Sequence, residues 1–425
     1  MQQQLRIIEA GKIFDGHAQS GLRNNVSIVI ENSQILDVLP TCEARRKYAG
    51  ATKDANVLDA KDMSVIPGIV DAHVHTRSSG DPIQRMCDPY RTQTADIAFR
   101  SLLNAQAALA SGITSIGDMA SVGYVDVSLR DYIERDQLLG PTMRVSGRGL
   151  TMYGGHMDPP MREETHLRDH TGLCNTPDEA RSAARYQISR GVDMVKLNVT
   201  DHMDLERGFV RQEMDLDMIE AATAQAHKAG LLVAAHCNGG SGATDAITAG
   251  IDALQHGWFL TEQQLHDMAE AGIYYVPTLS PPRKRLKARD CGLPVNVPEE
   301  RDVLGARVSA QRLMQAHKIG VKIAAGSDAG TLHNTHGTNA WEIVFMVEAG
   351  MSTMRALEAG TATAAAAIGL GDRKGRIAAG FDADLVLLSM DPTEDITAIV
   401  NAVFRVYRKG CPVKIRSGDM SCASQ

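Results

Sequence analysis

Six residues with metal-binding side chains stand at or near the ends of short apolar runs. His73 and His75 close the run VIPGIVDAHVH. Because alternate residues of a strand point to the same face, both imidazoles can bind one metal ion. Four more candidates end other runs of this kind: Lys196, His236, His256 and Asp328. If those runs are neighbouring strands, the six side chains meet, and the pattern predicts a metal centre.

Each of these residues also has a simpler interpretation. An isolated His-x-His pair occurs by accident on surface strands, and a lone histidine at a strand end is more often a hydrogen-bonded structural residue. Lys196 could extend its amine to solvent, and Asp328 could cap the next helix. The metal centre is favoured because these separate accidents would have to coincide at the ends of five different strands.

Further polar residues fall in loops near the same strand ends. His156 stands in the loop YGGH, where it could also simply face solvent. Arg77, Arg148 and Arg162 lie in other loops of the same rim. A guanidinium can bind a carboxylate through two parallel hydrogen bonds, so each arginine is a candidate for binding an acidic substrate.

A repeated signal predicts the elements that position these residues. A helical stretch ends in a glycine, which readily closes a helix in the left-handed conformation, and a β-branched apolar run follows at once. Seven glycines mark such points: Gly112, Gly140, Gly191, Gly230, Gly250, Gly272 and Gly320. With SVIPGIVDAH ahead of them, these runs predict an α/β fold, a (β/α)₈ barrel over residues 66–375. A doubly wound sheet is the alternative, but its GxGxxG turn is absent from the sequence.

The two ends of the chain have a different pattern. Residues 1–65 and 376–425 contain short alternating runs such as NVSIVIEN and ADLVLLSM, separated by turn residues. Neither end has enough apolar surface to fold alone. We therefore expect both ends to form one small discontinuous β-sandwich domain beside the barrel.

Composition limits the classes of partner. The chain has 425 residues, a net charge of -7 and only 4% aromatic residues. An acidic chain of this kind is a poor ligand for nucleic acid, and the basic segment PPRKRLKARD is interpreted as a solvated loop after the seventh strand. No run approaches the roughly 18 apolar residues of a membrane span. The seven cysteines include no CxxC pair, and the beginning of the chain lacks a signal-peptide pattern. We expect a cytoplasmic protein that acts on a small molecule.

The set of motifs resembles the amidohydrolase superfamily, specifically its binuclear metal subgroup. That subgroup has His-x-His after strand one, Lys after strand four, His after strands five and six, and Asp after strand eight. The segments VIPGIVDAHVH, VSGRGLTMYGGHMDP, LQHG, GSDAGT and GRIAAGFDADLVLL are similar to the imidazolonepropionase-related and Xaa-Pro dipeptidase-like branch, which includes ochratoxinase-like enzymes. The resemblance covers nearly the whole chain.

This resemblance implies a mechanism and its cofactors. Lys196 would carry a CO₂-derived carbamate that bridges two divalent metal ions, expected to be Zn²⁺. One ion would bind His73, His75 and Asp328, and the other would bind His236 and His256. A hydroxide that bridges the ions would attack the substrate carbonyl, and Asp328 would transfer its proton to the leaving nitrogen. His156 would contact the substrate or its oxyanion, and the protein would form a homo-oligomer.

The expected activity is hydrolysis of an amide C–N bond in a small molecule, as in dipeptidases and in carboxypeptidase-like enzymes that cleave N-acyl amino acids such as ochratoxin. Relatives specific for proline-terminal dipeptides carry a Tyr where this chain has Asn238. Asn238 is therefore a candidate substrate-binding residue, and proline specificity is not implied. A hydrolase of a carbamate, a urea or a cyclic amide remains an alternative, and a catalytically silent metal-binding protein is a more remote one.

Overall fold

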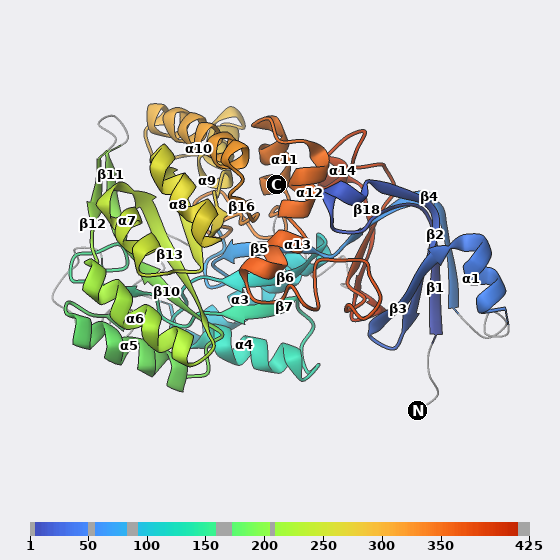
Figure 1. Ribbon diagram of the computed structural model, residues 1–425, viewed down its shortest axis with the longest axis horizontal. Coiled ribbons are helices and arrows are strands. Elements are labelled where there is room, and N and C mark those ends of the chain that lie inside the picture. Colours follow the sequence, from blue (N-terminus) through green and yellow to red (C-terminus); the bar gives the residue numbers. More distant parts are fainter. Residues whose placement is uncertain (1–4, 50–55, 83–91, 159–171, 205–208, 415–425) are drawn as a thin grey trace.

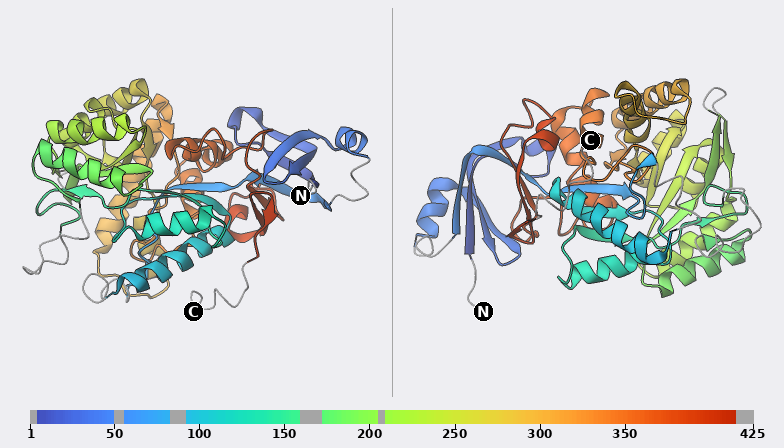
Figure 2. Two further views of the ribbon diagram at one scale, coloured as in Figure 1. Left: turned by 90° about the horizontal axis from the view of Figure 1, so that it is seen from below. Right: turned by 180° about the vertical axis from the view of Figure 1, so that it is seen from behind.

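The computed structural model describes residues 5–49, 56–82, 92–158, 172–204 and 209–414. An α/β barrel forms one part of the molecule, and a β-sheet built from both ends of the chain stands beside it (Figure 1). In two further views the sheet again projects from one side of the barrel (Figure 2). The parts are directly connected, because only Gly68 separates β4 (Asn56–Pro67) from β5 (Ile69–Val74).

Eight strands form the barrel wall, each from one of the apolar runs identified in the sequence. They are β5, β6 (Ile113–Asp118), β7 (Thr142–Val145), β10 (Met194–Asn198), β13 (Leu232–Gly239), β14 (Ala253–Phe259), β15 (Tyr274–Val276) and β16 (Lys322–Ile323). Neighbours pair in parallel within two arcs, β5 to β7 and β10 to β16. Backbone hydrogen bonds join the arcs, from Asp193 N to Val145 O at 2.8 Å and from Ala72 N to Ala325 O at 2.9 Å. The predicted barrel is confirmed.

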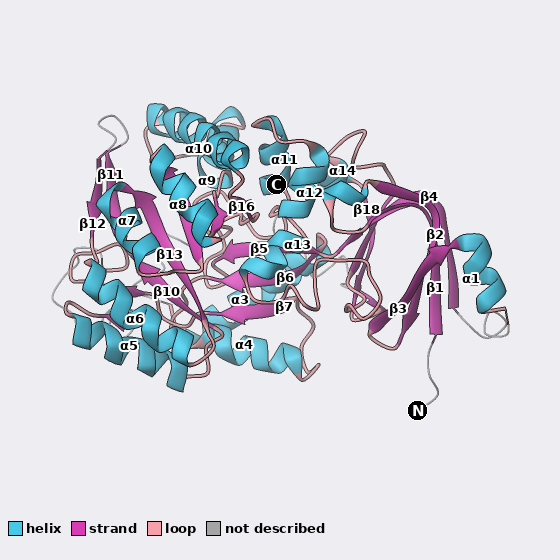
Figure 3. Cartoon of the chain, in the orientation of Figure 1, coloured by secondary structure: helices cyan, strands magenta, loops and turns pink. Residues whose placement is uncertain are grey.

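Helices cover the outside of the barrel wall (Figure 3). They are α3 (Thr94–Ala110), α4 (Val125–Glu134), α5 (Pro177–Ser189), α6 (Leu216–Lys228), α7 (Gly240–Thr248), α8 (Glu262–Ala271), α10 (Glu299–Ile319), α11 (Trp341–Glu348), α12 (Thr353–Ala359) and α13 (Ala362–Ala367). Six of the seven predicted glycines have the positive φ of such a helix end, and the exception is Gly140, because α4 already ends at Arg135. For example, α8 ends at Gly272 with φ of 73°, and α10 ends at Gly320 with φ of 94°. Each left-handed residue turns the chain back toward the next strand.

Short strands lie near the carboxyl end of the barrel. They are β8 (Leu150–Thr151), β9 (Gly172–Leu173), and the pair β11 (Thr200–Asp204) and β12 (Phe209–Gln212). β8 extends the wall beside β10, with Leu150 opposite Leu197. β11 and β12 form an antiparallel hairpin that follows β10 directly.

The basic segment after β15 is a helix rather than the loop that the sequence suggested. α9 (Ser280–Asp290) has prolines in its first turn. Backbone N–H groups in the first turn have no partner within the helix, so the missing N–H of proline costs no hydrogen bond there. Lys284 Nζ and Lys287 Nζ lie 5.3 and 4.4 Å from the centre of the Trp341 ring. The helix therefore packs two of its lysines on α11, while Arg285 and Arg289 pair with Asp302 on α10.

Both ends of the chain contribute to one mixed sheet of seven strands. Its members are β1 (Leu5–Phe14), β2 (Leu22–Glu31), β3 (Gln34–Pro40), β4, β17 (Leu385–Leu388), β18 (Val403–Arg408) and β19 (Cys411–Pro412), with η1 (Ala18–Ser20), α1 (Thr41–Lys47) and α14 (Ala398–Asn401) in the connections. The order is β19-β18-β17-β4-β1-β2-β3. Ile8, Ile28, Leu387 and Tyr407 belong to one buried cluster, so the two ends share a core. The two ends therefore form one domain with a shared core, as expected, and all of its strands belong to one continuous sheet.

Within the described part of the chain, no helix has the combination of length and apolar character that crossing a membrane requires. The cysteines described there are free thiols: Cys42, Cys174, Cys237, Cys291 and Cys411. Cys174 and Cys237 belong to the buried core of the barrel.

A buried ion pair connects the barrel to the end sheet. Lys374 Nζ lies 2.6 Å from Asp384 Oδ2, and these side chains are only 4% and 3% exposed. Asp384 O also accepts a hydrogen bond from Gly68 N, at the entry to β5. Because Lys374→Ala leaves the buried carboxylate without its counter-charge, we expect the free energy of unfolding to fall by about 3–5 kcal/mol. Urea denaturation monitored by circular dichroism measures this change.

Arg181→Ala is the matched control, since it removes an exposed ion pair with Asp178 on α5. Exposed pairs contribute little to stability, so its denaturation midpoint should stay close to that of the wild type. Equal midpoints for the Lys374 and Arg181 variants would show that the buried pair does not stabilise the junction.

Candidate active site

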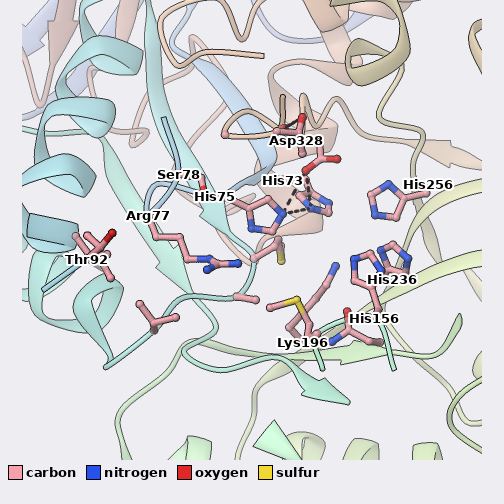
Figure 4. Close-up of a pocket in the computed structure, with 18 residues that line it drawn as sticks. His73, His75, Arg77, Ser78, Thr92, His156, Lys196, His236, His256 and Asp328 are labelled. Atoms are coloured by element: carbon pink, nitrogen blue, oxygen red, sulfur yellow. Dashed lines mark hydrogen bonds and ion pairs between the residues drawn. The ribbon is translucent and has the colours of Figure 1, made fainter. Parts of the chain in front are cut away.

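The carboxyl ends of the barrel strands surround a cavity of about 410 Å³. All six predicted metal-binding residues line it: His73, His75, Lys196, His236, His256 and Asp328. They come from β5, β10, β13, β14 and the segment after β16. Figure 4 shows their side chains around a common space. This is the position of reactive residues in barrels of this class.

Three of these side chains form a tight group. The Nε2 atoms of His73 and His75 lie 3.3 Å apart, and Asp328 Oδ1 lies 3.6 and 3.2 Å from them. Atoms with lone pairs repel one another at these distances unless a cation or a proton lies between them. Among the described residues, this is the only group of at least three His, Cys, Asp or Glu side chains whose ligand atoms all lie within 4.8 Å. Imidazole and carboxylate ligands fit Zn²⁺.

Burial keeps three histidines of the cavity neutral. His73 is only 1% exposed, and its pKa lies well below the ordinary value because burial disfavours the imidazolium. Burial likewise lowers the pKa of His236 well below the ordinary value and that of His256 to about 3. Since a metal ion requires the lone pair of a neutral imidazole, these side chains are in their ligating form at neutral pH.

The remaining candidate ligands lie beside the tight group. The rings of His236 and His256 have centroids 4.4 Å apart, and the His256 centroid lies 5.1 Å from that of His73. Lys196 is 2% exposed, and burial lowers its pKa to about 7, although the Asp328 carboxylate opposes the shift. Its Nζ donates a hydrogen bond to Gln255 Oε1. A large share of this amine is therefore uncharged at pH 7.

The backbone at the cavity is held in an uncommon conformation. His256, Thr278 and Asp328 have φ of 73°, 49° and 55°, in the left-handed region that non-glycine residues seldom adopt, β-branched ones least of all. Thr278 Oγ1 lies 2.7 Å from His256 Nδ1 and fixes the orientation of that ring. Such strain persists only where the surroundings enforce it, and it is concentrated at functional sites.

Asp71 organises the seam between the first and last strands of the barrel. Its carboxylate accepts hydrogen bonds from His73 N at 3.1 Å, Ser327 N at 2.9 Å and Asn339 Nδ2 at 2.8 Å. Burial raises the pKa of Asp71 to about 6, and the hydrogen bonds oppose that shift. One buried carboxylate thus fixes the backbone next to both His73 and Asp328. The sequence analysis gave Asp71 no role, although it stands in the same DAHVH segment.

Arg77 lies in a loop whose backbone carbonyl groups form hydrogen bonds with side chains from two other parts of the barrel. Asn104 Nδ2, on α3, donates hydrogen bonds to Thr76 O at 2.8 Å and to Ser78 O at 3.1 Å. The ring of His336, a buried residue of the loop after β16, lies 3.1 Å from Ser78 O. These contacts fix the backbone on both sides of Arg77, which lines the cavity as the sequence analysis expected of a rim arginine.

His156 also lines the cavity, on the side opposite Arg77 (Figure 4). Its ring stacks on that of His236, with centroids 4.0 Å apart and an angle of 26° between the rings. The side chain is 39% exposed. His156 therefore borders both a candidate metal ligand and the solvent-filled part of the cavity.

Two other predicted rim residues, Arg148 and Asn238, are not part of the cavity lining. The Arg148 guanidinium lies over the Tyr124 ring, 5.3 Å from its centre. Asn238 is 3% exposed, and its Nδ2 lies 3.3 Å from His236 Nε2, so it packs behind a candidate ligand. Arg162 lies outside the described residues. The sequence placed these residues near strand ends but did not show where their side chains point.

An apolar wall completes the cavity, and the sequence analysis did not identify it. Ile97, Met119, Val122 and Met157 contribute to the lining. They come from α3 and from loops, and no motif distinguishes them from ordinary core residues. The wall provides a surface on which the uncharged part of a substrate can pack.

Residues 64–413 match the family described as Amidohydrolase family. The chain belongs to this family. It is therefore a hydrolase that acts on C–N bonds. The match spans the barrel and the strands that follow it, so the amidohydrolase resemblance inferred from the motifs is confirmed.

Individual relatives place the chain in one branch of the family. Ochratoxinase from Aspergillus niger is 28% identical over 432 residues, covering 95% of this chain and 85% of that protein. A crystal structure of a Xaa-Pro dipeptidase with bound methionine has a TM-score of 0.83 at 29% identity, covering 97% of this chain and 100% of that one. A prolidase complexed with N-methylphosphonate-L-proline has a TM-score of 0.81 at 25% identity, with coverage of 97% and 100%. The predicted ochratoxinase and Xaa-Pro dipeptidase-like branch is confirmed.

The Asp71 network predicts an effect on metal affinity. Asp71→Ala removes the acceptor that fixes the backbone beside His73 and Asp328, so we expect Zn²⁺ to bind about 10- to 100-fold more weakly. Titration of chelator-stripped protein against a competing fluorescent chelator measures the affinity. Asp217→Ala, which removes an exposed carboxylate in the first turn of α6, should bind Zn²⁺ like the wild type. Wild-type affinity in the Asp71 variant would exclude this positioning role.

Proposed function

We propose that this amidohydrolase cleaves the amide bond of a small substrate that carries a free carboxylate, either a dipeptide or an N-acyl amino acid of the ochratoxin type. The observation that carries the proposal is the position of Arg77 in the same cavity as six metal-binding side chains. The guanidinium supplies a binding site for the carboxylate. A cavity of about 410 Å³ has the size of a small-molecule site.

Two divalent metal ions, expected to be Zn²⁺, belong to this proposal. His73, His75 and Asp328 would hold one ion, and His236 and His256 would hold the other. Bound ions of this kind lower the pKa of water and polarise a carbonyl group. The convergence of neutral imidazoles on one carboxylate supports this assignment.

Lys196 would join the two groups as a carbamate. The uncharged amine adds to CO₂, which forms an N–C bond and releases one proton. The product has two oxygens that share a negative charge, whereas an ammonium would repel both ions. The pKa of about 7 supports this role, because it leaves much of the buried amine uncharged at neutral pH.

The other side chains of the cavity bind and orient the substrate. Arg77 would bind the carboxylate, while His156, on the opposite side, would contact the carbonyl oxygen of the scissile amide. Among the described residues that line the cavity, Asp328 alone carries a carboxylate, so it would take a proton from the attacking water and return it to the leaving nitrogen. The apolar wall would pack against the rest of the molecule and exclude water.

The ligands of the solved relatives support a substrate with a carboxylate. One structure contains methionine and another contains N-methylphosphonate-L-proline, and each of these molecules is an amino acid or an N-substituted amino acid. Ochratoxinase matches over 95% of this chain. A cavity that contains an arginine suits molecules of the same chemical class.

Substitution of Arg77 tests the proposed substrate class. With N-acyl amino acids as substrates, Arg77→Met should raise KM about 10- to 100-fold, the loss expected for about 1.5–3 kcal/mol of hydrogen bonding to a charged group. With the methyl esters of the same compounds, the variant and the wild type should differ little. Steady-state kinetics on both series measures the difference.

Arg148→Met is the matched control, because Arg148 packs on Tyr124 outside the cavity lining, and its KM should equal that of the wild type. If the wild type hydrolyses only carbamates, ureas or cyclic amides without a carboxylate, the proposed substrate class is wrong.

A second variant tests the carbamate. Lys196→Ala should abolish hydrolysis because the two groups of ligands lose their bridge, and short carboxylic acids that can take its place should partly restore the rate. Lys228→Ala, at the exposed end of α6, should retain the wild-type rate. Near-normal activity of Lys196→Ala without added acid would refute the bridging role.

A further inference from the structure

The hairpin β11–β12 lies at the rim of the cavity and is firmly attached to the barrel. At its base, Glu213 N donates a hydrogen bond to Val199 O at 2.8 Å, next to the end of β10. The side chain of Gln212 accepts a hydrogen bond from Ser241 Oγ at 2.6 Å and donates one to Asp245 Oδ2 at 2.7 Å, both on α7. The hairpin is thus a fixed part of the barrel end.

Three side chains on or next to this hairpin contact the loop that carries His156. Glu213 Oε1 accepts a hydrogen bond from His156 N at 2.5 Å, and Arg211 Nη2 donates one to Gly154 O at 2.7 Å. Asp201 Oδ1 lies 3.7 Å from His156 Nδ1, and Asp201 also pairs with Arg211. The hairpin therefore contacts both the backbone and the ring of the histidine residue.

Glu213 is the buried centre of these contacts. It is 5% exposed, and its second oxygen accepts a hydrogen bond from Thr151 Oγ1 at 2.9 Å. A Cβ atom added to Gly155 would lie 2.2 Å from Glu213 Oε2. The loop thus packs directly on the carboxylate, and a side chain at position 155 would displace one from the other.

We infer that the hairpin β11–β12, with Glu213 at its base, positions His156 over His236 and so determines how the enzyme contacts its substrate. The inference rests on the proposed function, in which His156 contacts the substrate carbonyl. Glu213, Arg211 and Asp201 are positioning residues that act through His156. Because two glycines precede His156, the loop has high conformational freedom and needs external contacts to fix the ring.

A double-mutant cycle tests this coupling. Glu213→Ala should lower kcat/KM for an N-acyl amino acid by about 10- to 100-fold, since a displacement of about 1 Å can have such an effect. Glu213→Gln keeps an acceptor oxygen for His156 N and should lose less. In a His156→Ala background, Glu213→Ala should cause no further loss. An additive loss in the double variant would overturn the inference, because it would mean that Glu213 acts independently of His156.

Two further measurements separate positioning from general damage. Glu213→Ala should retain the metal content of the wild type, and Glu220→Ala, which removes an exposed carboxylate on α6, should retain full activity. Gly155→Ala provides a second route to the same displacement if Glu213→Ala does not fold.

Crystal structures of the Glu213 and Gly155 variants provide a result that does not depend on activity. We expect the His156 ring to leave its stacked position on His236. A ring that stays in place in both variants would overturn the inference, whether or not the wild type hydrolyses the proposed substrates. If the ring moves but the wild type cleaves no amide with a free carboxylate, the proposed function fails and the positioning role stands.

Discussion

The closure of the barrel between its first and last strands is the constraint on which the site depends. His73 lies in β5 and His75 directly follows it, whereas Asp328 follows β16, so their side chains meet only if these two strands are joined. His75 N donates a hydrogen bond to Ala329 O, and Asp328 N donates one to His73 O, both at 2.8 Å. The buried carboxylate of Asp71 binds backbone N–H groups on both sides of this seam. The short distances within the ligand group follow from this joint.

The loops around the site are also fixed by hydrogen bonds between side chains and the backbone. Buried polar side chains from other elements bind their backbone groups: Asn104 and His336 bind the carbonyls around Arg77, and Glu213 binds the N–H of His156. Loops at a barrel end usually tolerate movement. Here the hydrogen bonds set the two residues on opposite sides of the cavity, so the distance between them constrains the size of the molecule that can contact both.

Local signals in the sequence are sufficient to predict the barrel and the six candidate metal ligands in its cavity. Gly272 and Gly320 end helices as their sequence context indicated, and the alternation of His73 and His75 predicted that both face the same space. Arg148 and Asn238 are harder to place: Arg148 packs on the Tyr124 ring, which is distant in sequence, and Asn238 packs behind His236 although both residues belong to β13. The helix α9 is not evident from the sequence either, since its contact with Trp341 forms only in the folded barrel. The backbone strain at His256 and Thr278 leaves no trace in composition or spacing.

We propose that the six side chains at the barrel end form a binuclear metal centre. Metal analysis of purified protein by inductively coupled plasma mass spectrometry, after removal of loosely bound ions, is the direct test. We expect two divalent ions per chain in active protein, and the loss of both activity and ions on treatment with a chelator. Fully active protein with fewer than one divalent ion per chain would rule out the binuclear centre.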